Sequence, residues 1–83
     1  MSAAPLSKID LNLLVVLDVL LREKSVARTA DRLNLTSSAV SHALKRLRVL
    51  FGNELLVRDG RRMVPTARGE SLADSLPSLL TQV

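Results

Sequence analysis

The chain of 83 residues contains no cysteine, no tryptophan and no tyrosine, and Phe51 is its single aromatic residue. Without cysteine the chain forms no disulfide and offers no thiolate to a metal, and its one histidine has no carboxylate at helical spacing. Glycine and proline, three of each, are also scarce, which favours helix. Hydrophobic residues make up 47% of the chain, so we expect one small domain with an aliphatic core.

The sequence also lacks the patterns of an enzyme, of a secreted protein and of a membrane span. It has no glycine-rich phosphate loop, no nucleophile beside a base and no carboxylates paired at a useful spacing. The apolar stretch 11–21 is interrupted by Asn12 and Asp18 and is too short to cross a bilayer. The first residues do not form a cationic segment followed by a long apolar run. We therefore expect a cytoplasmic protein that is not an enzyme, with no membrane partner and no cofactor in this segment.

Basic charge is concentrated in one part of the chain. The formal net charge is +4, and residues 22–68 hold eleven of the twelve lysines and arginines against four acidic residues. This balance fits a polyanionic partner, although many other proteins are basic as well.

Residues 26–47 have the pattern of two short amphipathic helices joined by a tight turn, a helix-turn-helix. Val26, Ala30 and Leu33 recur at the spacing of one helix face. The second helix has a matching apolar face made of Val40, Ala43, Leu44, Leu47 and Phe51.

The residues between the two helices suit a turn. Ala30 is small where the helices must cross closely, and Asn34 tolerates the left-handed backbone that the turn needs. Leu35 is expected to fill the corner, and Thr36 is placed to cap the second helix.

The outward face of this second helix points to a function. Ser38, Ser41, His42 and Lys45 follow one another at i, i+3, i+4 and i+7, and Arg46 and Arg48 flank them. Such side chains can bond base edges in a major groove and hold phosphates. The alternative is an ordinary solvated face, which we would prefer if this helix stood alone.

Two more helices and a hairpin are predicted around this motif. Residues 10–23 predict a central helix capped by Asp10, with a buried strand as the alternative. Ser25 caps the next helix and places Arg28 in its first turn, where it either contacts phosphate or stays in solvent. Gly52 ends the helix that begins after Thr36.

Residues 54–65 predict a hairpin with Asp59-Gly60 as its two-residue turn. Arg58, Arg61 and Arg62 surround that turn, so the hairpin resembles a wing that reaches the minor groove or the backbone. A solubilising turn is the alternative.

Thr66 is placed to cap a last helix that should run toward the end of the chain. Its apolar stripe packs either on its own domain or on a second copy. We expect Pro77 to cause a bend or an early stop. Because no stop signal follows, we expect the natural chain to be longer. The residues predicted to form the dimer contact are Leu72, Leu76, Leu79, Leu80 and Val83.

The expected fold is mainly α: a winged helix-turn-helix with a three-helix core and a two-stranded wing, followed by a long dimerisation or linker helix. Residues 1–9 form an N-terminal arm, residues 10–65 the winged domain and residues 66–83 the linker helix.

This order of parts resembles the N-terminal domain of LysR-type transcriptional regulators, from Asp10 to about Ala73. The matching residues are Asp10-Leu11-Asn12-Leu13-Leu14, Ser25-Val26-Ala27-Arg28-Thr29-Ala30, Leu33, Ala39-Val40-Ser41-His42-Ala43-Leu44, Leu47, Gly52, Leu55-Leu56-Val57-Arg58, Gly60-Arg61 and Pro65-Thr66. The resemblance implies a bacterial, nucleoid-associated repressor or activator whose last helix pairs two copies. It also implies a small-molecule effector bound by a C-terminal domain outside this sequence, and it allows a tetramer for the full-length protein.

The resemblance further implies which residues contact double-stranded DNA of dyad symmetry. Family members use the start of the recognition helix and a wing arginine, which here are Ser37, Ser38, Ser41 and His42, with Arg58 and Arg61. Where the family usually has Gln-Pro, this chain has Ser37-Ser38, so base preference there should be shifted or relaxed. The alternatives are a sequence-neutral DNA-compacting protein and a winged helix that binds protein.

Overall fold

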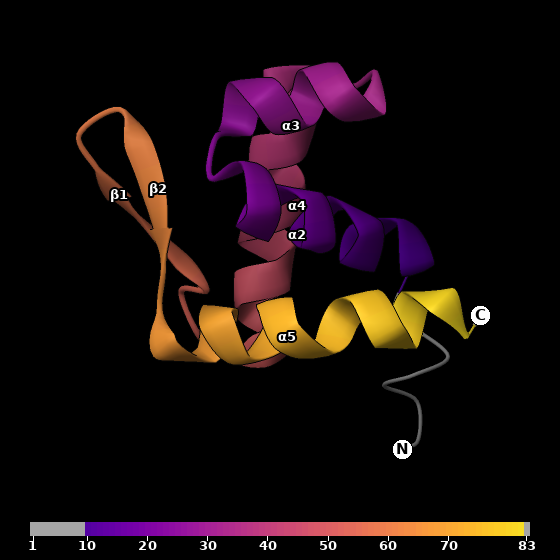
Figure 1. The fold of residues 1–83 in the computed structure, drawn as a ribbon. Coiled ribbons are helices and arrows are strands. Elements are labelled where there is room, and N and C mark those ends of the chain that lie inside the picture. Colours follow the sequence, from indigo (N-terminus) through magenta and orange to yellow (C-terminus); the bar gives the residue numbers. More distant parts are fainter. Residues whose placement is uncertain (1–9, 83) are drawn as a thin grey trace.

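The computed structural model describes residues 10–82 (Figure 1). The N-terminal arm predicted for residues 1–9, and Val83, lie outside the described residues. The elements follow in the order α2 (Leu11–Glu23), α3 (Val26–Leu33), α4 (Ser37–Phe51), β1 (Leu56–Asp59), β2 (Arg62–Pro65) and α5 (Ala67–Thr81). The predicted fold class is confirmed: three helices, a two-stranded wing and a last helix that lies along the base of the domain (Figure 1).

All four predicted N-terminal caps are confirmed. Each capping side-chain oxygen accepts a hydrogen bond from a backbone N–H of the first turn of its helix, which satisfies a donor that has no partner within the helix. The donors are the N–H groups of Asn12 for Asp10 (2.9 Å), Arg28 for Ser25 (3.1 Å), Ala39 for Thr36 (3.0 Å) and Gly69 for Thr66 (3.1 Å). The predicted ends of α3 and α4 are also confirmed. Asn34 follows α3 and Gly52 follows α4, and both take left-handed backbone angles, with φ of 59° and 60°.

The core is aliphatic and α2 lies at its centre, as predicted. This helix packs against α3, α4 and α5, and its Leu17 and Leu20 are completely buried. Val40 and Leu47 of α4 and Leu55 before the wing are buried in the same cluster. One core thus connects the recognition helix, the wing and the last helix, and sets their relative positions.

The corner between α3 and α4 differs from the prediction at one residue. Ala30 is buried, as expected of a small residue near a helix crossing, but Leu35 does not fill the corner, because 44% of its surface is exposed. Its backbone N–H donates to the Ala30 carbonyl at 2.8 Å, while its side chain lines an open hollow with Val15 and Leu33. A main-chain hydrogen bond, rather than an apolar plug, therefore closes this turn.

The hairpin exists, but its turn lies one residue later than predicted. Asp59 still belongs to β1 and stands opposite Arg62, so Gly60 and Arg61 form the two-residue turn. Gly60 takes the left-handed angle, with φ of 66°, that a residue with a side chain adopts only at a cost. Asp59 remains in the strand, where it faces a residue of opposite charge.

Of the two predicted effects of Pro77, a bend or an early stop, the early stop is wrong, because the last helix continues past Pro77 to Thr81. A proline in a helix removes the one hydrogen bond that its own N–H would make, and Leu76 beside it is held in the core with 1% of its surface exposed. This burial also corrects the predicted dimer stripe, because Leu76 packs within its own domain. In the described range, no helix combines the length and apolar character that a bilayer crossing requires.

Candidate nucleic-acid interface

The outward face of α4 has the predicted orientation. Val40, Ala43, Leu44 and Leu47 point into the core, which is why the opposite side of the helix faces solvent. The six residues predicted to contact DNA from this helix are all exposed: Ser37, Ser38, Ser41, His42, Lys45 and Arg46. An open hollow of about 460 Å³ runs beside this face, with Ser38, His42 and Arg46 along it. Hydroxyl, imidazole and cationic groups are therefore presented together on one ridge.

The wing places an arginine next to this ridge. Arg58 of β1 is paired with Met63 of β2, and both line a groove of about 260 Å³ between the wing and α4. Ser41 of the recognition helix lies on the other side of the same groove. Folding thus brings together two predicted site residues that the sequence separates by most of α4.

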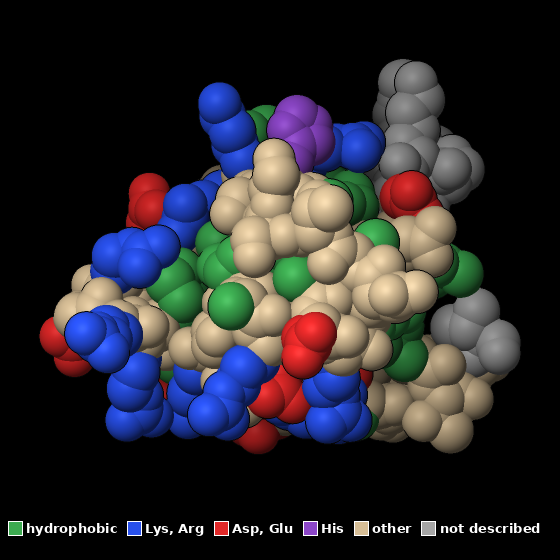
Figure 2. All heavy atoms as spheres, turned by 90° about the horizontal axis from the view of Figure 1, so that it is seen from above, with side chains coloured by type: hydrophobic (Ala, Val, Ile, Leu, Met, Phe, Trp, Pro, Cys, Tyr) green, Lys and Arg blue, Asp and Glu red, His purple; other side chains and the backbone are tan. Residues whose placement is uncertain are grey.

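A second groove collects basic side chains between the start of α3 and the tip of the wing. Arg28, Arg61 and Arg62, all predicted to contact DNA, line it together with Lys24. Its one carboxylate, Glu23, already accepts a hydrogen bond from Arg32 at 3.2 Å. Figure 2 shows the resulting arc of Lys and Arg side chains, which passes around the wing and continues to the single histidine at the upper edge.

Sequence reasoning did not include Lys24 in the interface. The residue ends α2 with φ of 56°, and its carbonyl accepts a hydrogen bond from the Met63 N–H of the wing at 3.0 Å. This bond joins two segments that are far apart in the sequence, so no local sequence pattern predicts it. The hydrogen bond from Met63 places Lys24 beside Arg61 and Arg62.

Most interface cations are not neutralised by the protein itself. Within residues 10–82 the ion pairs join Arg22 to Asp18, Arg32 to Glu23 and Arg48 to Glu54. None of the lysines and arginines predicted to contact DNA takes part in these pairs. Their charge is available to an anion, and the partner best suited to an extended basic surface with hydroxyl groups at its centre is a nucleic-acid backbone.

The predicted dimer stripe on α5 divides into buried and exposed parts. Leu72 and Leu80 are half-buried, whereas Leu79 is 54% exposed. Leu76, as described above, lies in the core. Of the five predicted contact residues, Leu79 is therefore the one most accessible to another chain among those that the structure describes.

A helix-turn-helix with an exposed polar and basic recognition face, flanked by an arginine-bearing wing, defines the DNA-binding domain of a transcription regulator. The model of the family described as bacterial regulatory helix-turn-helix protein, lysR family, matches residues 11–70. The chain belongs to this family of non-enzymatic transcription regulators, and it forms their DNA-binding domain.

Relatives in rhizobia share nearly half of the residues. The chain is 44% identical over 75 residues to Nodulation protein D 1 of Rhizobium meliloti (strain 1021). It is 45% identical over 78 residues to the HTH-type transcriptional regulator SyrM of Rhizobium etli. These matches cover 90% and 94% of this chain but only 24% and 23% of the two proteins, so the chain spans about a quarter of the length of these relatives.

Solved structures have the same fold. The probable transcriptional regulator PA0477 from Pseudomonas aeruginosa matches with a TM-score of 0.86 and 46% sequence identity, over 92% of this chain and 26% of that one. The BenM DBD, solved in complex with catB site 1 DNA, matches with a TM-score of 0.83 and 24% identity, over 89% of this chain and 83% of that one. The second likeness concerns the fold alone.

Proposed function

We propose that this domain binds a specific site in double-stranded DNA, with α4 in the major groove and the wing arginines at the minor groove or the backbone. The observation that carries the proposal is the exposed ridge of α4, where Ser41 and His42 stand free of the protein's own chain between two basic surfaces. An α-helix fits the major groove, and short polar side chains can bond base edges there.

The proposed roles follow from where each side chain lies. Ser37, Ser41 and His42 read bases from the start and middle of α4. Lys45 and Arg46 hold phosphates on one side of the helix. On the other side, phosphates are held by the wing arginines and by Lys24 and Arg28, which line the second groove. Two serines replace the Gln-Pro that is usual in the family, so a bidentate amide contact is missing. We expect a base preference at that position that differs from the family's or is weaker.

The second part of the proposal is a homodimer through α5. Leu79 is the exposed apolar residue of the predicted stripe, and the half-buried Leu72 and Leu80 lie on the same helix. Two copies related by a two-fold axis would favour a dyad-symmetric site with half-sites about one helical turn apart, or a multiple of it. The relatives that this chain matches are about four times as long. In a protein of that length, we propose that an effector-binding domain controls DNA binding at the nucleoid in the bacterial cytoplasm, in a dimer or a tetramer.

Selection of bound DNA from a random pool tests this function. The expected result is one enriched motif with two inverted halves. Competition against random DNA at fixed salt should then show a preference for that motif of roughly a thousandfold or more. Binding without enrichment would instead support a sequence-neutral DNA-compacting protein. A failure to shift any duplex at low salt would support the protein-binding alternative.

The solved complex of the BenM DBD with DNA supports the proposed mode of binding by its fold, which this chain shares. The CbnR DBD, which was also solved with DNA, has the same fold with a TM-score of 0.83.

A further inference from the structure

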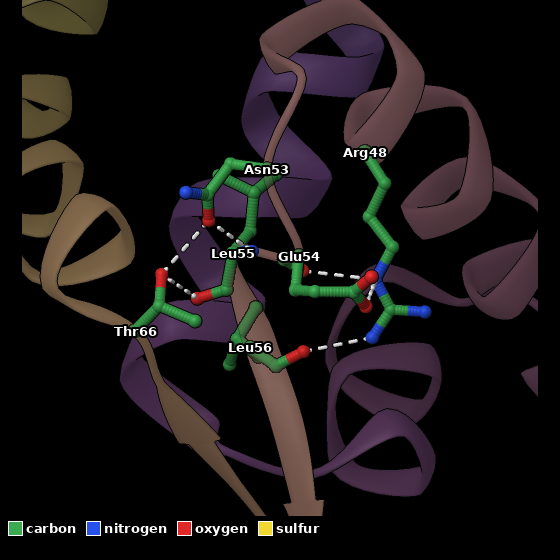
Figure 3. Close-up of polar contacts among 6 residues, drawn as sticks. All are labelled: Arg48, Asn53, Glu54, Leu55, Leu56 and Thr66. Carbon is green, nitrogen blue, oxygen red and sulfur yellow. Dashed lines mark hydrogen bonds and ion pairs between the residues drawn. The ribbon is translucent and has the colours of Figure 1, made fainter.

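One arginine of the recognition helix is bonded to the wing. The Arg48 guanidinium donates from Nε to the Glu54 carbonyl at 2.8 Å and from an Nη to the Leu56 carbonyl at 2.7 Å (Figure 3). The Glu54 carboxylate lies 3.3 Å from the same Nε. Among the described residues, Arg48 is the one α4 side chain that hydrogen-bonds the segment leading into β1.

These bonds fix the wing relative to α4 because a guanidinium is a rigid, planar fork. Two carbonyls held by one fork leave little freedom for the strand that begins at Leu56. Hydrogen bonds to a charged donor are also stronger than neutral ones. The other end of the segment is held separately: the Thr66 hydroxyl donates to Asn53 Oδ1 at 3.0 Å, and the same Asn53 oxygen accepts the Leu55 N–H at 2.8 Å (Figure 3).

The fixed position matters for the predicted DNA contacts. Arg58 follows Leu56 by two residues and therefore projects from the same face of β1. Arg48, Arg58 and Ser41 line one groove. We therefore expect a change at Arg48 to alter the distance between the wing arginine and the base-reading face of α4.

We infer that Arg48 is a specificity-determining positioning residue, which holds the wing in register with the recognition helix and does not itself bind phosphate. The inference rests on the proposed function of the same surface. Under this inference, the base preference at the outer positions of a half-site, next to the wing, depends on Arg48, although Arg48 bonds the protein and not the DNA. Preference at the central positions, read by α4, does not depend on it.

The test compares the 83-residue chain with three variants in selection from a random DNA pool. In Arg48→Met the aliphatic part of the side chain is kept and both carbonyl bonds are lost. Arg48→Lys keeps the charge but cannot form the fork. Arg46→Met is the matched control, because Arg46 is an exposed cation of the same helix that takes part in no hydrogen bond or ion pair among the described residues.

Arg48→Met and Arg48→Lys should both lose about tenfold of the discrimination at the outer positions, the worth of a charge-assisted hydrogen bond, and should retain the central motif. Arg46→Met should weaken binding to all sequences and keep the full motif. The salt slope should fall in Arg46→Met and remain unchanged in Arg48→Lys.

Hydrogen exchange without DNA gives a second readout. Amides of residues 56–64 should exchange about tenfold faster in Arg48→Met than in the parent chain, while those of Leu17 and Leu20 should be unchanged. Glu54→Gln should leave wing exchange nearly unaltered, because the Glu54 side chain is 68% exposed and its main-chain carbonyl still accepts the Arg48 hydrogen bond.

The possible outcomes separate the two proposals. If the parent chain enriches no motif, the proposed function is overturned together with this inference. If it enriches a motif that Arg48→Met also enriches, with unchanged outer positions, this inference alone is overturned. The same holds if the loss in Arg48→Met is even across all positions and the salt slope falls, since Arg48 would then bind phosphate directly.

Discussion

At the scale of single residues, the junction of the wing with α5 depends on the absence of a side chain. A Cβ built on Gly69 would lie 2.1 Å from the carbonyl oxygen of Leu55, a main-chain atom that cannot move aside cheaply. Leu55 itself is completely buried and has φ of 68°, a left-handed angle for a residue with a side chain. The hydrogen bonds to Asn53 and Thr66 hold it in that conformation.

Gly69→Ala should therefore lower the free energy of unfolding by about 1–3 kcal/mol or more, through overpacking against Leu55. Urea unfolding followed by circular dichroism measures the change. Ser78→Ala, an exposed position of the same helix, is the control and should stay within about 0.5 kcal/mol of the parent chain. Equal stability of the two variants would mean that the helix and Leu55 can separate at no cost.

Thr29 is a polar residue that is buried without a hydrogen bond from its side chain to any of the described residues. Its side chain is completely buried in α3, and its hydroxyl has no hydrogen-bond partner in the part of the chain that the structure describes. A buried hydroxyl without a partner costs roughly 1–3 kcal/mol of desolvation.

Thr29→Val, which keeps the shape and removes the hydroxyl, should leave the free energy of unfolding unchanged or raise it by as much as about 1–3 kcal/mol. Thr29→Ala removes the methyl group as well and should lower stability by about 1 kcal/mol, because it leaves a cavity. Thermal unfolding of both variants checks the pair. A valine variant less stable than the alanine variant would show that the hydroxyl has a partner.

At the scale of elements, α5 contains a proline that its packing tolerates. Pro77 lies at an exposed position beside the buried Leu76, so the helix is held by the core on one side of the defect. The Thr81 hydroxyl donates to the Pro77 carbonyl at 2.7 Å and closes the last turn. What Pro77 lacks is the N–H that would bond the Ala73 carbonyl.

Pro77→Ala should raise the free energy of unfolding by about 1–3 kcal/mol, since it restores that donor and a better helix former. The urea midpoint should increase with an unchanged slope. A lower midpoint would indicate that the rigidity of proline, which restricts the unfolded chain, outweighs the missing hydrogen bond.

The wing carries arginines that are predicted to contact DNA. Its Arg58 faces the groove shared with Ser41, and no acidic residue within the described range pairs with it. Arg58→Ala should weaken binding to every DNA sequence, should weaken the preference at the outer half-site positions next to the wing, and should reduce the slope of log K against log salt by about one, if the side chain neutralises one phosphate. Arg32→Ala, which removes a cation already paired with Glu23, should leave the slope unchanged. Equal slopes in all three proteins would exclude phosphate contact by Arg58.

At the scale of the whole molecule, the basic surface and the exposed part of α5 lie on different elements, so the proposed DNA contact and the proposed dimer contact use different residues. The proposed dimer depends on Leu79, the most exposed of its described residues. Leu79→Asp should raise the dimer dissociation constant by roughly tenfold or more, because burying a leucine is worth about 1.5–3 kcal/mol. Sedimentation over a range of concentrations measures it.

Ser78→Asp introduces the same charge on an adjacent exposed position and is the control for that experiment. If the two variants associate equally, α5 does not pair through the Leu79 face. A parent chain that stays monomeric at every concentration would reject a dimer formed by these residues alone.

The local features of this molecule could be predicted from the residues. The caps at Asp10, Ser25, Thr36 and Thr66 depend on bonds within one helical turn. The orientation of α4 follows from the period of its apolar residues, and so the exposure of Ser41 and His42 could be predicted as well.

The features that could not be predicted depend on contacts between distant segments. The space around Leu35 and Leu76 is set by which helices pack against them, and the turn at Gly60-Arg61 by the pairing of Asp59 with Arg62. Lys24 enters the basic groove through a hydrogen bond from Met63, and Arg48 turns from the outer surface to the wing because two carbonyls lie within its reach. Periodicity and capping act within a few residues of the chain and therefore determined the helices and the recognition face. Only packing in three dimensions decided which cations face the partner and which hold the domain together.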